Sequence, residues 1–166
     1  MVKNVSFIVI AYNEEFAIKK CLDSITEMQL INCEVICVDS DSTDNTLAIM
    51  KNYKDKIDNY KIFQVEGDVN AAIARNVGIK NTENKKYIFF IDGDIEVNHE
   101  FLLASIEKLK NNNIVTGKLI DYEYNVNYNK LENIKCRYNK QNEQIIDRTG
   151  GIFIARKEAV NKNGLF

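Results

Sequence analysis

The chain has 166 residues, of which 45% are hydrophobic, and its formal net charge at pH 7 is −2. This length and apolar content fit one globular domain with a core of its own. The slightly acidic balance argues against a nucleic-acid-binding protein, which would need a basic face. No apolar run approaches the ~18 residues of a membrane-spanning helix, and the N-terminus lacks a signal-peptide pattern. We therefore expect a cytoplasmic domain with no nucleic-acid partner and no membrane span in this segment.

Short hydrophobic runs alternate along the chain with segments of helical periodicity. The runs expected to form strands are residues 5–12, 33–39, 60–66 and 86–92. The segments expected to form helices are residues 14–28, a stretch that begins near Asp44, and residues 69–81. The apolar stripe of the first helix is expected to include Phe16. The alternation predicts βαβ units, and hence an α/β fold with a mostly parallel sheet flanked by helices on both faces.

Four cysteines lack the paired spacing of a zinc site or a disulfide framework. They are Cys21, Cys33, Cys37 and Cys136. Cys33 and Cys37 fall in a hydrophobic run that is expected to be a buried strand. We therefore expect reduced core thiols, as is usual in a cytosolic protein.

Polar and acidic residues follow each of the four expected strands. They occur in "AYNEE", "DSDSTD", "EGD" and "DGD", in chain order. Loops expected at the opposite edge of the sheet, such as "QLIN" and "NTENKK", show no such concentration of acids. Because ligands of open α/β sheets bind beyond the carboxyl ends of the strands, these residues predict a ligand site.

Asp92 and Asp94 follow the fourth expected strand, with only Gly93 between them. Alternation along a strand end places the two carboxylates on the same side, and the glycine is expected to let a ligand approach the backbone. Two close carboxylates repel each other unless a cation or a proton intervenes. Oxygen ligands of this kind select Mg²⁺ or Mn²⁺. The alternative is a solvated turn that happens to carry two acids.

Five segments of the chain occur in an order and at a spacing typical of one enzyme family. They are "VSFIVIAYNEEFAIKKCLDSI", "VICVDSDSTDNTLAIM", "AAIARNVGI", "YIFFIDGDIEV" and "GGIFIARKEAV". In these segments the chain resembles the family 2 glycosyltransferases, which have the GT-A fold, a Rossmann-like nucleotide-diphospho-sugar transferase fold. The resemblance covers nearly the whole chain. It implies a nucleoside diphosphate sugar donor and a Mn²⁺ or Mg²⁺ cofactor.

The resemblance also implies roles for individual residues at the expected ligand edge. Tyr12 matches the aromatic residue that packs on the nucleotide base, and Glu14 the acid placed toward the base or ribose. Asn13, between them, is assigned to the same nucleotide-sugar site. Asp39 matches the aspartate that accepts a hydrogen bond from the base edge. Arg75 matches a basic residue near this aspartate and the phosphates.

The resemblance also implies which residues bind the metal and the donor sugar. Asp94 resembles the direct metal ligand, and Asp92 the ribose-side member of the metal-binding pair. Gly93 belongs to the same segment. Gly150 and Gly151 match small residues that lie beneath the donor sugar.

Other roles remain open for several of these residues. Tyr12 can instead cap the edge of the core, Asp39 can cap a helix as Asp44 is expected to do, and Arg75 can serve as an ion-pair partner. His99, the only histidine, lies at an expected helix start, where capping is favoured over catalysis. Two further positions depart from the family pattern, because Asp41 and Asn70 stand where glycine is usual, and we expect the loops there to be shaped differently.

The family places the general base of inverting members after a "G-x-F-D-E" stretch, and no such stretch occurs before Phe166. We therefore expect residues 1–166 to be a single GT-A domain truncated on its acceptor side, with the base beyond Phe166. Residues 1–97 are expected to form the nucleotide-binding part, and residues 98–166 the start of the acceptor-side part. The acids that could be proposed as the base instead match no family motif. They are Asp121, Glu123 and Asp147.

The function that follows from the resemblance is inverting transfer of a sugar to an acceptor hydroxyl, in the synthesis of a cell-surface polysaccharide or glycoconjugate. UDP-sugars are the expected donors and a sugar or lipid-linked glycan the expected acceptor, at the inner face of the membrane in the full-length protein. One alternative is a nucleotide-sugar-binding module without catalysis. Another is a sugar nucleotidyltransferase, which would carry a glycine-rich loop where this chain has "AYNEE".

Overall fold

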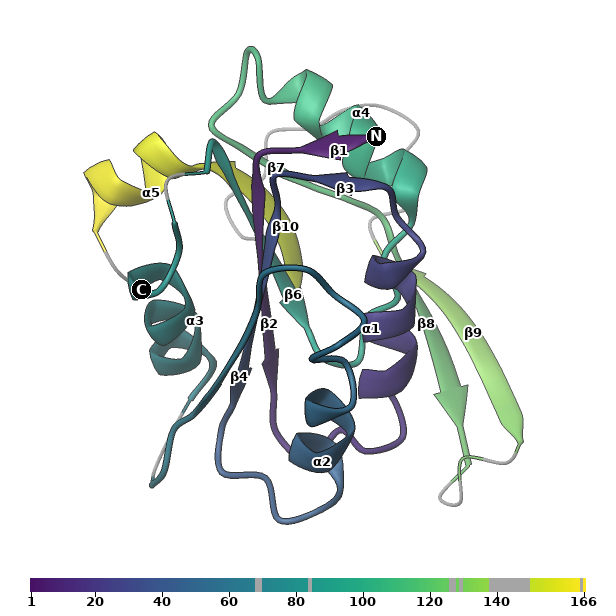
Figure 1. Ribbon diagram of the computed structural model, residues 1–166. Coiled ribbons are helices and arrows are strands. Elements are labelled where there is room, and N and C mark those ends of the chain that lie inside the picture. The colour runs from purple at the N-terminus through teal and green to yellow at the C-terminus, as the bar shows by residue number, and fades with distance from the viewer. Residues whose placement is uncertain (68–69, 84, 126–127, 129, 138–149, 165) are drawn as a thin grey trace.

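A six-stranded sheet forms the centre of the molecule (Figure 1), with the strand order β5–β4–β2–β6–β10–β7. The four mutually parallel strands are β5 (Tyr60–Gln64), β4 (Glu34–Asp39), β2 (Val5–Ala11) and β6 (Tyr87–Asp92). The strand β10 (Ile152–Arg156) runs antiparallel to both of its neighbours, β6 and β7 (Ile114–Thr116). The computed structural model describes residues 1–67, 70–83, 85–125, 128, 130–137, 150–164 and 166. The predicted mostly parallel sheet is confirmed.

Helices cover both faces of this sheet, because its central strands are apolar on both sides. The helices are α1 (Ile18–Thr26), α2 (Thr46–Lys51), α3 (Ala71–Lys80), α4 (His99–Lys108) and α5 (Lys157–Asn163). In β2, Phe7 and Val9 belong to the core that α1, α2 and α4 help to build, whereas Ile8 and Ile10 belong to a second core with α3. Successive side chains of a strand point to opposite faces, so this division is the one that a fully buried strand requires.

The first helix begins later than the sequence pattern predicts. Residues before Ile18 form a turn in which the Ala17 and Ile18 N–H groups donate to the Glu14 carbonyl, at 3.0 and 2.9 Å. Phe16 lies in this turn and its side chain is 59% exposed. The expectation that Phe16 is part of the buried stripe is therefore wrong.

Asn70 and Asp41 are the two positions at which loops of a different shape were expected. Asn70 is the N-cap of α3, and its side-chain oxygen accepts a hydrogen bond from the Ile73 N–H at 2.9 Å. This contact satisfies one of the free N–H groups of the first helical turn. Asp41 adopts a φ of +62°, in the left-handed region that aspartate tolerates better than most residues. The Asp41 backbone thus keeps a conformation that glycine adopts readily.

Two small sheets were not expected from the sequence. Within "QLIN", Leu30–Ile31 form β3, which pairs in parallel with β1 (Val2–Lys3). The strands β8 (Leu119–Tyr124) and β9 (Leu131–Arg137) form an antiparallel hairpin that stands beside α1 in Figure 1. The hairpin therefore belongs to the part of the chain that the sequence pattern assigned only loosely to the acceptor side.

Two further expectations concern membrane spans and thiols. In the part of the chain that the structure describes, no helix is long and apolar enough to cross a bilayer. Cys21, Cys33 and Cys37 are buried, as expected, but Cys136 lies exposed on β9. The prediction of core thiols is therefore wrong for Cys136, because the hairpin that carries it stands outside the core.

Candidate functional site

The loops after β2 and β4 are joined by hydrogen bonds at the carboxyl edge of the sheet. The Asn13 N–H donates to Ser42 Oγ at 2.9 Å, and the Asn13 side-chain oxygen accepts from the Thr43 N–H at 2.9 Å. The Glu14 N–H donates to Thr46 Oγ1 at 2.7 Å. Asn13 adopts a φ of +54°, which asparagine tolerates. The two loops therefore form one unit, and the structure places the Asn13 side chain on Thr43.

Asp39 ends β4 with a fully buried carboxylate. Its Oδ2 accepts a hydrogen bond from the Ser42 N–H at 3.1 Å. Its Oδ1 is buried and has no hydrogen-bond partner among the described residues. A buried oxygen without a partner is costly and uncommon in folded proteins, so it indicates a position prepared for a donor from outside. Asp39 thus keeps one acceptor oxygen that no described residue uses.

Arg75 reaches from α3 to the end of β6. Its Nη2 donates to Asp92 Oδ1 at 2.7 Å, and the two side chains are 15% and 36% exposed. Burial raises the pKa of Asp92 and the charge of Asp94 adds to this, while the Arg75 charge acts in the opposite direction. The Arg75 Nε is itself buried without a partner among the described residues. Arg75 is therefore an ion-pair partner of Asp92, and its Nε–H group remains available as a hydrogen-bond donor.

Acidic side chains gather around this pair. Burial raises the pKa of Glu14 to about 7, and the charges of Asp94, Asp44 and Asp92 add to the effect in that order. Asp94 is exposed, and its carboxylate accepts no hydrogen bond from the described part of the chain. The expectation that the polar strand ends converge is therefore confirmed for the ends of β2 and β6.

The carboxylates at this edge form only part of a donor set for a divalent cation. Among the described residues, no group of three or more His, Cys, Asp or Glu side chains could hold a metal ion by itself. Mg²⁺ is usually held through one or two carboxylates, with water and substrate phosphates completing its shell. The open carboxylate of Asp94, beside Asp92, fits this partial donor set. A metal here would depend on a phosphate ligand for the rest of its coordination.

Two glycines shape the site, in different ways. A Cβ at Gly93 would lie 2.8 Å from the Ala11 Cβ, so the glycine lets the turn pack against β2. The space beside Gly93 is therefore filled by protein, which corrects the expectation that it opens the backbone to a ligand. A Cβ at Gly151 would lie 2.2 Å from Asp92 Oδ2, and the Gly151 carbonyl accepts from the Asp92 N–H at 2.9 Å. Gly151, next to the half-buried Gly150, thus determines where the Asp92 carboxylate can lie.

Exposed aromatic side chains occur after β2 and on the hairpin. The Tyr12 side chain is 60% exposed, so it does not cap the core. Phe16 stacks on Tyr128, with ring centroids 4.6 Å apart and planes 13° apart, and Tyr128 stacks on Tyr124. This row of rings was not predicted from the sequence. No local pattern could have revealed it, because Phe16 is in helical register with the buried residues of α1 and its partner Tyr128 lies in a distant segment.

The remaining candidates lie apart from these contacts. His99 is the first residue of α4, where Asn98 accepts from the Phe101 N–H at 3.0 Å, so the expected helix start is confirmed. Glu123, on β8, forms an ion pair with Lys135 on β9. Asp121 also lies on β8, and Asp147 lies outside the described residues.

Comparison with known proteins decides the family. A model of the family described as glycosyl transferase family 2 matches residues 6–164. This chain belongs to glycosyltransferase family 2. Over 122 residues it is 36% identical to the poly(ribitol-phosphate) beta-glucosyltransferase of Bacillus spizizenii, and the match covers 69% of this chain and 19% of that protein. The chain thus spans about a fifth of the length of this curated relative.

Solved structures agree with the family and its GT-A fold. The structure is similar to Staphylococcus aureus TarS 1-349 in complex with UDP-GlcNAc, with a TM-score of 0.69 and 27% identity over 96% of this chain and 47% of that chain. It is also similar to the mannosyltransferase PcManGT of Pyrobaculum calidifontis in complex with GDP-Man and Mn²⁺. That match has a TM-score of 0.55 and 25% identity, over 67% of this chain and 34% of that chain.

Proposed function

We propose that this family 2 domain binds a nucleoside diphosphate sugar, with UDP as the favoured nucleotide, for transfer of the sugar to an acceptor hydroxyl with inversion. The observation that carries the proposal is the position of Asp39, the Arg75–Asp92 pair and Asp94 at the carboxyl ends of the parallel strands β4 and β6. UDP-GlcNAc in the similar TarS structure supports the choice of UDP.

The nucleoside would lie on the loop unit formed by the segments after β2 and β4. The exposed Tyr12 ring offers a stacking surface for the base. The unpartnered Oδ1 of Asp39 can accept a hydrogen bond from a ring N–H of uracil. Glu14 lies on the same loop and would face the base or ribose. We assign Asn13 an indirect role, because its side chain already holds Thr43 in place.

The diphosphate would lie near the end of β6. Arg75 brings a positive charge to this otherwise acidic region and orients Asp92, which we place on the ribose side. Asp94 would hold Mn²⁺ or Mg²⁺ with help from Asp92. The cation, when bound, neutralises charge on the diphosphate leaving group. Gly150 and Gly151 would lie beneath the donor sugar, because Gly151 already borders the Asp92 carboxylate.

Our proposal for the acceptor is less specific than that for the donor. The curated relative named above acts on poly(ribitol-phosphate), which supports an acceptor hydroxyl on a cell-surface polymer or a lipid-linked glycan. We assign no described residue as the general base, and Glu123 is engaged by Lys135. The three buried thiols suit a reducing compartment, so we place the domain in the cytoplasm, at the inner face of the membrane in the whole protein.

Titration calorimetry tests the donor site directly. UDP should bind with Mn²⁺ or Mg²⁺ present and more weakly after chelation, whereas GDP should bind less tightly than UDP. Asp94→Asn is the matched variant, because it removes the charge without changing the size of the side chain. Equal affinity for UDP with and without metal would contradict the metal assignment. Tighter binding of GDP than of UDP would contradict the choice of nucleotide.

Two alternatives make different predictions in the same assays. A non-catalytic module would bind UDP-sugar without any turnover by the whole protein when acceptors are supplied. A sugar nucleotidyltransferase would release pyrophosphate from a nucleoside triphosphate and a sugar phosphate. The segment "AYNEE" occupies the position of the glycine-rich loop that such an enzyme needs, and this observation favours the glycosyltransferase.

A further inference from the structure

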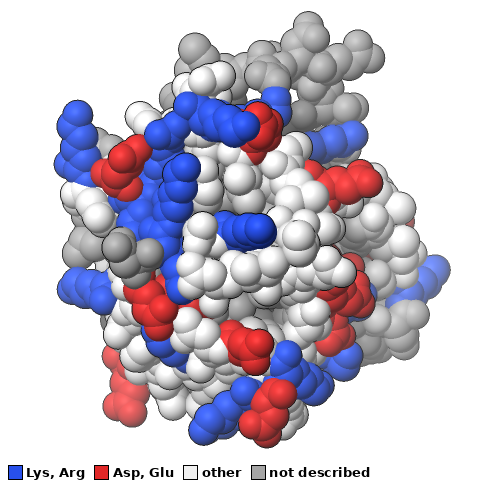
Figure 2. All heavy atoms as spheres, turned by 45° about the horizontal axis from the view of Figure 1, so that its top comes forward, with Lys and Arg blue, Asp and Glu red and all other residues white. Residues whose placement is uncertain are grey.

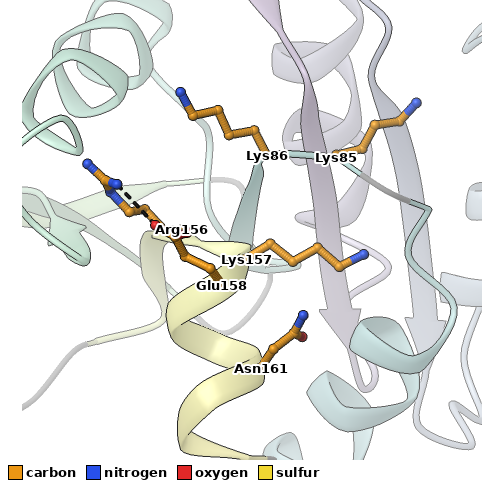
Figure 3. A pocket seen from close by; sticks show the side chains of 6 residues that line it. All are labelled: Lys85, Lys86, Arg156, Lys157, Glu158 and Asn161. Carbon is orange, nitrogen blue, oxygen red and sulfur yellow. Dashed lines mark hydrogen bonds and ion pairs between the residues drawn. The ribbon is translucent and has the colours of Figure 1, made fainter.

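Basic side chains line a hollow of about 330 Å³ at the amino edge of the sheet, but they do not converge. Figure 2 shows Lys and Arg side chains gathered on this edge, with acidic side chains between them. In Figure 3, Lys86 and Arg156 extend to one side of the hollow and Lys157 extends to the other. The Lys86 ammonium lies 5.2 Å from the centroid of the Tyr87 ring, whereas the Lys157 ammonium contacts backbone carbonyls after α3. The organised polar contacts of the molecule lie instead at the carboxyl edge.

Three consecutive backbone N–H groups of the loop after β2 donate to three side chains that follow β4. The pairs are Asn13 with Ser42 Oγ at 2.9 Å, Glu14 with Thr46 Oγ1 at 2.7 Å, and Glu15 with Asp44 Oδ2 at 3.1 Å. Both loops lie at the lower edge of the sheet in Figure 1. Each N–H group is fixed in its peptide plane, so three successive hydrogen bonds fix the orientation of three peptide planes. The segment 42–46 therefore determines the path of the chain through residues 13–15.

Thr46 has the most enclosed of these side chains, because it is fully buried. Its hydroxyl donates to Asp44 Oδ1 at 2.5 Å, and the same oxygen accepts from the Thr46 N–H at 2.9 Å. A hydroxyl group has only one proton, so this bond to Asp44 leaves the Thr46 oxygen to accept from the Glu14 N–H. Asp44 thus sets the direction of the hydrogen bond between Thr46 and Glu14.

Two carboxylates link the loops reciprocally. Asp44, after β4, accepts from the Glu15 N–H, and Glu15, after β2, accepts with Oε2 from the Asn45 N–H at 3.2 Å and from Asn45 Nδ2 at 2.7 Å. Burial acts to raise the pKa of Asp44, but hydrogen bonds from Thr46 and Glu15 outweigh it and lower this pKa. Asp44 is therefore ionised at neutral pH, and a charged acceptor forms the stronger hydrogen bonds.

The loop held in this way carries the proposed nucleoside contacts. Tyr12 directly precedes the first of the three N–H groups, and Glu14 bears the second. Ser42 contacts both loops, because its N–H donates to Asp39 Oδ2 at 3.1 Å while its Oγ accepts from the Asn13 N–H. The same segment thus determines how the ring of Tyr12 and the carboxylate of Asp39 are placed relative to each other.

Both loops contain a residue in the left-handed region, which makes their shape dependent on such contacts. Asn13 has a φ of +54° and Asp41 a φ of +62°. Asparagine and aspartate tolerate this region better than most residues, yet such conformations persist only where the surrounding structure determines them. Loss of a hydrogen bond between the loops should therefore let the backbone near Asn13 relax.

We propose that Thr46 and Asp44 are positioning residues of the donor site, which hold the loop after β2 in the conformation that receives the base. This role rests on the proposed function, because it requires that the nucleoside binds on this loop. Neither residue is assigned a contact with the nucleotide. Without their hydrogen bonds, fewer of the folded molecules would hold Tyr12 and Glu14 in place, and apparent affinity falls in proportion to the competent fraction.

Thr46→Val and Thr46→Ser test the role of the hydroxyl as a pair. Valine keeps the shape of threonine without its hydroxyl, whereas serine keeps the hydroxyl. In the chain without ligand, hydrogen exchange at the Glu14 amide should become faster in Thr46→Val and stay slow in Thr46→Ser. Uridine affinity, measured by calorimetry on the folded protein, should fall by about fivefold in Thr46→Val, as for the loss of an ordinary hydrogen bond, and recover in Thr46→Ser.

Two further variants complete the experiment. Thr82→Val is the matched control, because Thr82 Oγ1 donates to the Ile79 carbonyl at 2.8 Å at the end of α3, and its loss should lower stability without changing uridine affinity. Asp44→Asn is the milder variant if Thr46→Val does not fold. Its side-chain oxygen can still accept from Thr46, while its NH₂ group would face the Glu15 N–H, so uridine affinity should fall in the same direction.

Different results would overturn this proposal and the proposed function. Unchanged uridine affinity in Thr46→Val, or in Asp44→Asn if the first variant does not fold, would show that the contacts only stabilise the fold. An equal loss of affinity in Thr82→Val would show a general effect of destabilisation. Slow exchange at the Glu14 amide in Thr46→Val would show that the hydroxyl does not hold the loop. If the unchanged chain binds neither uridine nor UDP, the donor site itself is wrong and the positioning role is wrong with it.

Discussion

Arg75 Nη2 and Asp92 Oδ1 lie 2.7 Å apart, and their ion pair links helix α3 to the last residue of strand β6. The strands are otherwise joined by the backbone ladders of the sheet, and the helices pack on them through the two apolar cores. The ion pair thus adds a polar connection between side chains at the edge where the nucleotide sugar would bind. It also holds a cation beside carboxylates that would otherwise only repel one another and the diphosphate.

Arg75→Ala should destabilise the fold by about 1 kcal/mol at pH 7, since the pair is partly exposed and partly screened. The loss should shrink at pH 4, because burial raises the pKa of Asp92 and a protonated Asp92 no longer needs a cation. Urea unfolding at both pH values measures this. The control is Arg75→Ala made in an Asp92→Asn background, where the pH dependence of the loss should disappear. An equal loss at both pH values would show that packing of Arg75, rather than its charge, matters.

Asp39→Asn should separate base recognition from folding. The amide oxygen can still accept from the Ser42 N–H, while its NH₂ group would face the ring N–H of the base, donor against donor. We expect affinity for uridine and for UDP to fall together, by about tenfold to a hundredfold, as for a lost hydrogen bond to a charged group. Calorimetry with both ligands measures the change, and thermal unfolding without ligand checks the fold. A loss for UDP alone would place Asp39 under the phosphates.

Asp94→Asn should weaken binding of UDP without weakening binding of uridine. Uridine affinity should stay unchanged, because the nucleoside carries no phosphate, whereas UDP affinity in Mn²⁺ should fall to the level measured after chelation. The comparison of the two ligands in the two variants is made under identical buffer conditions. If uridine and UDP weaken in the same proportion in both variants, the roles of Asp39 and Asp94 have been assigned wrongly.

Gly93→Ala and Gly151→Ala should have contrasting effects. The Cβ added at Gly93 would lie 2.8 Å from Ala11 Cβ in the core, so we expect a loss of stability of about 1–3 kcal/mol from overpacking. The Cβ added at Gly151 would meet the Asp92 carboxylate, which can rotate away, so stability should change less and UDP affinity more. Unfolding and binding measured on both variants test this. A larger loss of stability in Gly151→Ala would contradict it.

Glu14 should make stability depend on pH between about 4.5 and 7. In this window the folded state keeps a proton on Glu14 that the unfolded state has already lost, because burial raises its pKa to about 7. The folded state is thus favoured at the lower end, and stability falls as pH rises through the window. Glu14→Gln removes this dependence and should be more stable at pH 8 by about 1 kcal/mol, a value reduced for partial exposure. Unfolding of the unchanged chain and of Glu14→Gln, measured in chelating buffer from pH 4.5 to 8, tests this. The two plots of unfolding free energy against pH should converge at low pH. Parallel plots would contradict the prediction.

The sequence was sufficient to predict the four parallel strands and the edge of the sheet at which acidic residues gather. Apolar runs such as that of β2 are long, bounded by polar turns and buried on both faces, so their period and length leave little ambiguity. The spacing of the acidic strand ends then located Asp39, Asp92 and Asp94, since the carboxyl ends of parallel strands share one edge. These are properties of local pattern and topology.

Other features depended on contacts between distant segments. The space around Gly93 is filled by Ala11, which no local pattern of the turn could indicate. Phe16 is apolar and in helical register, yet Tyr128, from the hairpin more than a hundred residues later, gives it a partner outside the core. The hairpin itself was missed because its side chains are largely exposed, so the alternation of buried and exposed residues that marks a core strand is weak there.

The position of β10 between β6 and β7 has a consequence for the order in which the protein can form during synthesis. Strands β2, β4, β5 and β6 leave the ribosome first and can pair with one another, but β6 then presents an open edge of unpaired backbone groups. Phe153 pairs with Phe90 across this edge only once the intervening segments have been made. Nascent chains that stop before Ile152 would therefore expose a hydrophobic strand edge, and such edges recruit other chains. A chaperone that shields β6 during this interval would act where the growing molecule is most prone to aggregate.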